Sequence, residues 1–245
     1  MIVNLQDEGW EIIYHRAHAL LAAQIAGNWD RSKTPQRIYE TLAAISHHDD
    51  LEKEWEEDQL TTAGAPLDFT LEREIGLEKM QRHAENALYR GRWVALLTSM
   101  HLSFLNEGRR DQDKDLAKFL DQQQQQQTQW REELGVSEKA VESAYYFMRW
   151  CDRLSLILCQ QQVPEAGRQL EVQIGPDGKH YYVSQLENGS VGVTPWPFNE
   201  EKITVNVEAS CLSQLKFESN DELRQALKQA PRKLLTWTFE PTAAA

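Results

Sequence analysis

Cysteine is scarce in this sequence, which has only Cys151, Cys159 and Cys211 among its 245 residues. The three are widely spaced and none is separated from another by two residues, so the chain has no CxxC motif and no basis for a disulfide framework. Cys151 and Cys159 fit small apolar core residues better than reactive thiols. An odd number of widely spaced thiols is typical of a reducing compartment, and we expect a cytoplasmic protein.

Basic charge and long apolar runs are also lacking. The 26 Lys and Arg residues are outnumbered by 38 Asp and Glu residues, which gives a formal net charge of −12. This excess of negative charge argues against binding to a nucleic-acid backbone. No apolar run approaches the roughly 20 residues that span a bilayer, and the start, MIVNLQDEGWEII, does not resemble a secretory signal. We therefore expect no nucleic-acid partner and no membrane partner.

Helical periodicity dominates residues 1–164. Residues 10–29, WEIIYHRAHALLAAQIAGNW, carry apolar side chains at helical spacing and end in a Gly-Asn stop. Thr34 and Pro35 fit the N-cap and first position of a second helix, PQRIYETLAAISHHDD. Further helices are expected at about residues 71–90, at 91–105, through the six glutamines 122–127, and after an N-cap at Ser137 through SAYYFMRWCDRLSLILCQQ.

The pattern changes after Pro164. Segments such as HYYVSQ, VGVTPW and ITVNVEAS alternate or are rich in β-branched and aromatic residues, and one helix, NDELRQALKQA, precedes the last strand. We therefore predict a mainly α protein: an all-helical domain at 1–164, followed by a small antiparallel β-rich subdomain at 165–245 with one helix. The strands of this subdomain could pack on the helical domain or pair across a homodimer through an open edge.

Four predicted helices each carry an imidazole or a carboxylate among apolar residues. These side chains are His18 in HALLAAQIA, His48 with Asp49 after TLAAISH, His101 in SMHLSFL, and Asp152 in YYFMRWCDRLSLILC. Burial of an unpaired carboxylate is costly, so Asp152 needs a metal, a cation such as a neighbouring arginine, or several hydrogen bonds. Imidazole and carboxylate together suit a divalent transition metal.

The order of these residues resembles the HD-domain superfamily of metal-dependent phosphohydrolases, over about residues 10–160. In this resemblance, His18 corresponds to the family's early His and His48-Asp49 to its His-Asp doublet. His101 corresponds to a further His, and Asp152 to the late Asp in an apolar helix. More narrowly, the blocks HALLAAQ, HHDD, SMHLSFL and CDRLSL are similar to an uncharacterised bacterial domain-of-unknown-function family. The doublet could also use His47, with Asp49 or Asp50.

The resemblance implies a divalent ion (Mn, Fe, Mg, Co or Ni) and a small phosphate ester or nucleotide as substrate. Such an ion lowers the pKa of a water molecule that it binds and polarises a phosphoryl oxygen. The implied metal ligands are His18, His48, Asp49 and Asp152, with Asp49 and His101 as the catalytic pair. His101 could act as a general acid, bind a second metal, or be a core histidine. Candidate phosphate-binding cations are Arg153, Arg149 and Arg92, with Arg82 and Arg90 as further candidates.

Two other functions remain open at this stage, a di-iron oxygenase on the same scaffold and a non-catalytic interaction protein. A second iron would recruit His101, and His83 is a further candidate, although its setting in RHAENALY predicts an exposed side chain. The acidic run from Glu52 to Asp58 is typical of a solvated face; if it lined the site it would repel a polyphosphate, which argues against a nucleoside triphosphate. Trp55, within that run, could cover the mouth of the site.

Overall fold

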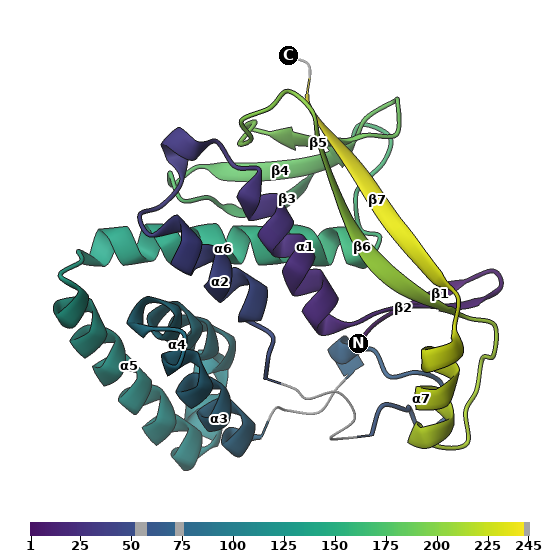
Figure 1. Ribbon diagram of the computed structural model, residues 1–245, viewed down its shortest axis with the longest axis horizontal. Helices are drawn as coiled ribbons and strands as arrows, with labels where there is room; N and C mark the ends of the chain where they lie inside the picture. The colour runs from purple at the N-terminus through teal and green to yellow at the C-terminus, as the bar shows by residue number, and fades with distance from the viewer. Residues whose placement is uncertain (52–57, 72–75, 243–245) are drawn as a thin grey trace.

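The structure is a computed structural model, and it describes residues 1–51, 58–71 and 76–242. Most helices gather on one side of a sheet, the helix before the last strand lies apart from them, and the chain's first and last strands belong to that same sheet (Figure 1). Trp55 and most of the acidic run, residues 52–57, lie outside the described residues, so their predicted roles remain predictions. In the described ranges, no helix has both the length and the apolar character needed to cross a membrane.

The helices follow the predicted order with some shifted ends. The α-helices are α1 (His15–Gly27), α2 (Ile38–His47), α3 (Leu77–Leu88), α4 (Arg92–Asn106), α5 (Lys114–Leu134), α6 (Glu138–Cys159) and α7 (Asn220–Gln229). Short 3-10 turns occupy η1 (Arg31–Lys33), η2 (Phe69–Leu71) and η3 (Glu107–Gln112). The glutamine run is helical within α5, and the Ser137 side chain caps α6 by accepting from the Ala140 amide, as predicted.

Seven strands among the described residues form one mixed sheet in the order β1-β2-β6-β7-β5-β4-β3. The strands are β1 (Ile2–Gln6), β2 (Gly9–Ile13), β3 (Leu170–Ile174), β4 (His180–Gln185), β5 (Val191–Thr194), β6 (Ile203–Leu212) and β7 (Arg232–Pro241). The pairing of β5 with β7 is parallel and the others are antiparallel. The fold is therefore α+β. The prediction of a mainly α protein with an all-helical first part was wrong.

An N-terminal hairpin accounts for that error. Asp7 and Glu8 form the tight turn between β1 and β2, and β2 begins at Gly9, which has a φ of +133°. β2 then pairs with β6, with Trp10 opposite Leu212. Ile12 and Ile13 are buried in the sheet, so they extend the apolar pattern of the following helix although they belong to a strand. The helix expected from Trp10 begins instead at His15.

The start of the second helix was also predicted wrongly. Asp30 caps the turn η1 by accepting from the Ser32 amide, and Thr34 is the C-cap residue that follows this turn. α2 begins at Ile38, after Arg37 in a left-handed conformation with a φ of 57°. Because Asp30 starts a separate short turn, Thr34 and Pro35 belong to the connection and not to the helix.

α6 is central to the packing, since it contacts α1, α2, α4 and β3. Trp150 of α6 and Trp29 pack edge to face, with ring centroids 4.7 Å apart, and both contact Phe198 from the sheet side. Gln24 of α1 donates to the carbonyl of Asn206 in β6 and accepts from its amide (2.9 and 3.1 Å). One apolar core thus spans the helices and the sheet, and the predicted domain boundary at residue 164 remains a prediction.

Candidate metal centre

Four helices bring five side chains to one point. His18 comes from α1, His101 from α4 and Asp152 from α6, while His48 and Asp49 directly follow the last residue of α2. Ligand atoms of His18, His48 and Asp152 all lie within 4.8 Å of one another, and so do those of His48, Asp49 and His101. We call these five residues the His/Asp cluster. The structure therefore brings together all of the metal ligands expected from the sequence, and His101 with them.

The contacts within the cluster pair imidazole nitrogens with carboxylate oxygens. His18 Nε2 lies 2.5 Å from Asp49 Oδ2, and His48 Nε2 lies 3.1 Å from Asp152 Oδ1 and 3.6 Å from Asp49 Oδ2. The three histidines are buried, whereas the side chains of Asp49 and Asp152 remain 23% and 15% exposed. The carboxylates therefore mark the side from which solvent reaches the cluster.

Hydrogen bonds outside the cluster determine which ring nitrogens point inward without a hydrogen. His48 Nδ1 donates to the carbonyl oxygen of Ile45 (2.7 Å), which can only accept. The Ser155 hydroxyl donates to the carbonyl of Asp152 (2.8 Å), so it accepts from His18 Nδ1 at 3.0 Å. In a neutral ring the Nε2 atoms of His18 and His48 then present lone pairs to two carboxylates. This arrangement requires positive charge between them.

The pKa values of His48, Asp49 and Asp152 also indicate that positive charge stabilises the cluster. Burial alone would lower the pKa of His48, but the charges of Asp49 and Asp152 outweigh it and raise that pKa to about 10. Against the opposing effect of burial, His48 holds the pKa of both carboxyl groups below the usual range. Without an ion, a proton on His48 balances part of the negative charge. A divalent cation would supply that charge, and the mixed imidazole and carboxylate donor set fits a transition-metal ion.

His101 differs from the other two histidines. Its ring centroid lies 5.3 Å from that of His48, and its Nδ1 lies 3.5 Å from the Tyr145 hydroxyl. Burial, and then the positive charge on His48, lower the pKa of His101 to about 4. The ring is therefore neutral at pH 7, which suits a ligand or a proton acceptor better than a general acid.

The arrangement of the cluster also indicates how many ions it can hold. Both possible ligand groups found among the described residues include His48, whose Nδ1 is committed to Ile45. One remaining nitrogen binds one ion, so the two groups describe alternative ligand sets for a single ion.

His47, the other candidate for the doublet, points away from the cluster: it bonds Asp50 at 2.8 Å and is 38% exposed. The doublet of the cluster is therefore His48-Asp49.

Two of the arginines favoured from the sequence, Arg149 and Arg92, contact side chains outside the cluster. The Arg149 guanidinium stacks 3.5 Å from the Phe104 ring centroid and donates to Gln173. Arg92 is largely exposed and forms an ion pair with Glu133. Arg153 is partly buried, and no hydrogen bond or ion pair found in the described part of the chain joins it to the cluster.

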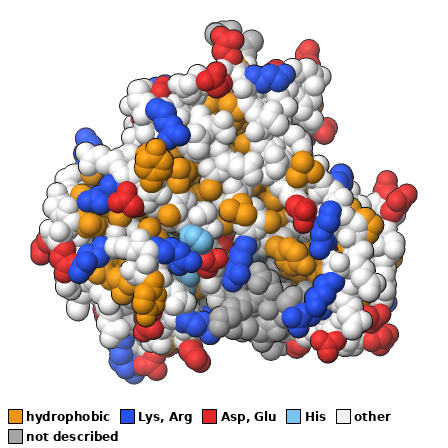
Figure 2. All heavy atoms as spheres, in the orientation of Figure 1, with side chains coloured by type: hydrophobic (Ala, Val, Ile, Leu, Met, Phe, Trp, Pro, Cys, Tyr) orange, Lys and Arg blue, Asp and Glu red, His pale blue; other side chains and the backbone are white. Residues whose placement is uncertain are grey.

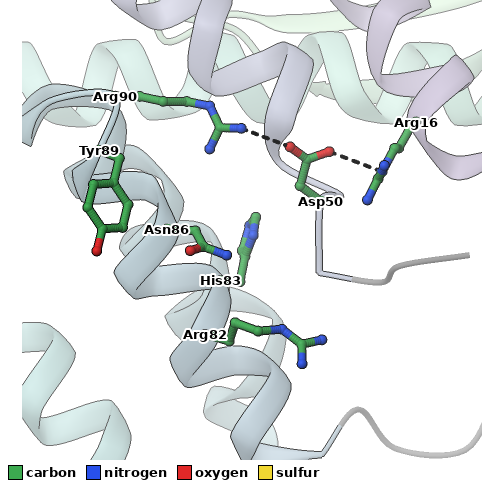
Figure 3. A pocket seen from close by; sticks show the side chains of 7 residues that line it. All are labelled: Arg16, Asp50, Arg82, His83, Asn86, Tyr89 and Arg90. Carbon is green, nitrogen blue, oxygen red and sulfur yellow. Dashed lines mark hydrogen bonds and ion pairs between the residues drawn. The ribbon is translucent and has the colours of Figure 1, made fainter. Parts of the chain in front are cut away.

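A cavity of about 430 Å³ lies next to the cluster and has a different set of cations. We call it the arginine recess, and its described lining is Arg16, Asp50, Arg82, His83, Asn86, Tyr89 and Arg90. Asp50 lies between two of the guanidinium groups, at 3.3 Å from Arg16 Nε and 3.3 Å from Arg90 Nη2 (Figure 3). On the face in Figure 2, a histidine surface lies among Lys and Arg side chains.

Sequence reasoning missed parts of this recess. His83 was expected to be exposed, but it is buried and its Nε2 donates to the carbonyl of His48 at 3.1 Å. The helical spacing of Met80, His83, Ala84 and Ala87, all buried on one face of α3, could have revealed it. No pattern indicated Arg16, which reaches Asp50 from another helix.

A family model described as Protein of unknown function (DUF3891) matches residues 1–214. The chain belongs to this family. The expected membership of an uncharacterised domain-of-unknown-function family is thereby confirmed, and the matched range contains the cluster, the recess and strands β1–β6. Searches of curated proteins and of solved structures found no significant match.

Proposed function

We propose that this protein is a divalent-metal-dependent phosphohydrolase that acts on small phosphate esters. The observation that carries the proposal is the convergence of two imidazole lone pairs, those of His18 and His48, on the carboxylates of Asp49 and Asp152. Such a buried arrangement is electrostatically unfavourable without a cation and well suited to hold one. The order of these residues along four helices, which resembles the HD-domain superfamily, supports the same function by analogy.

Each residue of the cluster has a distinct part in the proposed site. His18, His48, Asp49 and Asp152 would hold the ion, and Ser155 and the Ile45 carbonyl would orient the two rings. When bound, the ion would lower the pKa of a water molecule and withdraw charge from a phosphoryl oxygen. Asp49 lies at the exposed edge of the cluster, so the phosphate would arrive from that side.

His101 would accept a proton or complete the ligand set. Its low pKa leaves the ring neutral at pH 7, and its Nδ1 lies 3.5 Å from the Tyr145 hydroxyl, which can orient it. The single available nitrogen of His48 favours one ion, and so a phosphohydrolase, over the two ions of a di-iron oxygenase.

The first experiment is a metal analysis of the purified protein, as isolated and after reloading with Mn²⁺, Fe²⁺, Co²⁺, Ni²⁺ or Mg²⁺. Asp152→Ala removes one carboxylate of the cluster, and Asp121→Ala, at an exposed position of α5, is the matched control. We expect near-stoichiometric metal in the wild type and the control, and loss of metal in Asp152→Ala.

Activity is then measured on a panel of phosphomonoesters that includes p-nitrophenyl phosphate. Turnover that requires the reloaded ion and disappears in Asp152→Ala would support the proposal. A folded wild-type protein that takes up no metal would overturn it and leave the non-catalytic function. A visible absorption band with two irons per chain would favour the oxygenase.

A further inference from the structure

A second cavity, of about 420 Å³, lies where the end of α6 meets the sheet. We call it the Glu11 cavity, and we propose that it binds a small organic ammonium ion with an apolar body, whose charged group pairs with the carboxylate of Glu11. Its described lining shares no residue with the His/Asp cluster or with the arginine recess. The inference therefore does not depend on the proposed phosphohydrolase function.

The end of α6 separates this cavity from the cluster. Leu158 lines the cavity and lies six residues beyond Asp152 on α6, which corresponds to about 9 Å along the helix axis. Asn4 of β1 donates to the carbonyl of Cys159 at 2.7 Å, so the last residue of the helix is joined to the sheet. A cavity of this volume falls in the range of small-molecule sites.

One wall of the cavity is apolar. Leu235 and Trp237 alternate along β7 and so point to the same side of the sheet, which is the side that packs against the helices. Other apolar lining residues include Leu158, Val163 and Val191. Leu235, Trp237 and Val163 remain partly exposed although they pack against the core, so an apolar ligand body would remove their remaining surface from water.

A buried carboxylate forms the floor of the cavity. Glu11 of β2 belongs to the lining although its side chain is only 3% exposed. One carboxylate oxygen accepts from Gln161 Nε2 at 2.9 Å, and the other lies 3.3 Å from Lys233 Nζ. Among the described residues, Lys233 is the one charged partner of Glu11, and its side chain is 58% exposed. The carboxylate is thus held in place, while its cation lies on the solvent side.

This ion pair restricts which ligand can replace the head of Lys233. A buried carboxylate that loses its cation is strongly destabilised, so a neutral or anionic ligand would not displace Lys233 from Glu11. An ammonium ligand restores the ion pair, while the lysine head moves into water, where most of its side chain already lies. The exchange of one ammonium group for another is nearly balanced, and contact of the ligand body with the apolar wall then favours binding.

The charge of the rim favours the same ligand. Glu165 also lines the cavity and is exposed, and its side chain has no hydrogen bond or ion pair in the described part of the chain. The described lining thus carries two carboxylates against the single ammonium group of Lys233, so it attracts cations and disfavours carboxylates. The ring of Trp237 provides an aromatic face, which also attracts ammonium groups.

The test compares three probes of matched length, titrated into the full chain by calorimetry at pH 7.5. Phenylbutylamine carries an ammonium group, phenylbutyrate carries a carboxylate and phenylbutanol carries no charge. We expect the amine to bind the wild type about tenfold or more tightly than the alcohol, and the carboxylate to bind most weakly.

Two variants change the charges of the cavity in opposite directions. Glu11→Gln keeps the shape of the side chain and removes its charge, and it should weaken binding of the amine by about tenfold while leaving binding of the alcohol unchanged. Lys233→Gln removes the competing ammonium group, and it should strengthen binding of the amine. Glu171→Gln, at an exposed glutamate of β3 that pairs with His180, is the matched control and should stay within about twofold of the wild type.

Several results would overturn the inference. The wild type could fail to bind the amine, or bind all three probes equally. Tighter binding of phenylbutyrate than of phenylbutylamine would instead assign the cavity to an anion held by Lys233. Equal losses in Glu11→Gln and Glu171→Gln, or weaker binding of the amine in Lys233→Gln, would also contradict it.

The inference and the proposed function fail separately. A protein that takes up no metal but binds the amine through Glu11 would retain the cavity and lose the phosphohydrolase. Circular dichroism shows whether each variant is folded before titration. If Glu11→Gln does not fold, the change in affinity of Lys233→Gln decides the outcome, because the two occupants, cation and anion, predict opposite signs.

Discussion

At the scale of single residues, Ser155 connects the two halves of the cluster. Its hydroxyl accepts from His18 Nδ1 and donates to the backbone carbonyl of Asp152, so it fixes the ring that points at Asp49. Loss of such a supporting hydrogen bond weakens metal sites by about 10- to 100-fold. We predict that Ser155→Ala lowers metal affinity by this factor, as measured by competition with a chelator of known affinity.

A matched control lies on the same helix. Ser143 of α6 donates to the carbonyl of Pro176, far along the helix from the cluster. Ser143→Ala also removes a serine hydrogen bond, but it should leave metal affinity unchanged. Equal weakening in both variants would mean that Ser155 acts through the stability of α6 and not through the orientation of His18.

The pH dependence of stability follows from His48. Its pKa is raised in the folded, metal-free protein from 6.5 to about 10, because Asp49 and Asp152 outweigh the effect of burial. The protonated ring therefore contributes stability in full below pH 6.5, and this contribution is lost as the pH rises towards 10. Between pH 7 and 9 we predict that the free energy of unfolding falls by about 1.4 kcal/mol per pH unit.

Urea unfolding of metal-free protein at pH 7, 8 and 9 measures this slope. His48→Gln should flatten it, whereas His180→Gln, at an exposed histidine paired with Glu171, should preserve it. A stability that is constant over this range in the wild type would show that His48 is neutral without the ion.

At the scale of elements, the hairpin β1–β2 depends on Gly9. Its φ of +133° is unfavourable for other residues, and a Cβ there would overlap the carbonyl oxygen of Leu212 on β6. We predict that Gly9→Ala destabilises the fold by about 2 kcal/mol or more, measured by chemical denaturation.

Gly27 provides the comparison for this substitution. It ends α1, and a Cβ at this position would meet nothing within 4 Å. Gly27→Ala should be neutral or stabilise the protein by up to about 1 kcal/mol, because alanine has the higher helix propensity. Similar losses at the two glycines would contradict the role of the β2–β6 contact.

The contrast between predicted and missed elements has a physical cause. α5 and α6 were predicted because helix propensity and an N-cap are local signals, visible in the glutamine run and at Ser137. The strand β2 was missed because Ile12 and Ile13 read as a continuation of the apolar stripe of α1. Only pairing with β6, about 200 residues later, distinguishes that strand from a helical turn.

The residues of the candidate site were likewise predictable from the sequence only in part. His18, His48, Asp49, His101 and Asp152 could be selected from the sequence, because imidazoles and carboxylates are conspicuous among apolar residues. Arg82 and Arg90 were among the candidate cations, but Arg16 was not, because it reaches this place only through Asp50, which follows a different helix. The stacking of Arg149 on Phe104 could not be read from the sequence either, because it joins two helices.

At the scale of the whole molecule, the helices and the sheet share one core. Gln24 pairs with the backbone of β6, and Trp29 packs against both α6 and Phe198. We predict that a chain shortened to residues 1–164 lacks a cooperative unfolding transition by circular dichroism. A shortened chain that unfolds cooperatively and binds metal like the full chain would support an independent helical domain.

The pairing of β2 with β6 also has a consequence for synthesis on the ribosome. Residue 13 is complete 190 residues before β6 begins at residue 203, so at typical translation rates the hairpin waits on the order of 10 to 40 seconds for its partner. Throughout that interval the apolar hairpin has an unpaired edge, and all the cluster residues, from His18 to Asp152, are synthesised within it. Neighbouring nascent chains on a polysome can then pair with that edge in place of β6. Slower elongation before residue 203 would give them more time to do so.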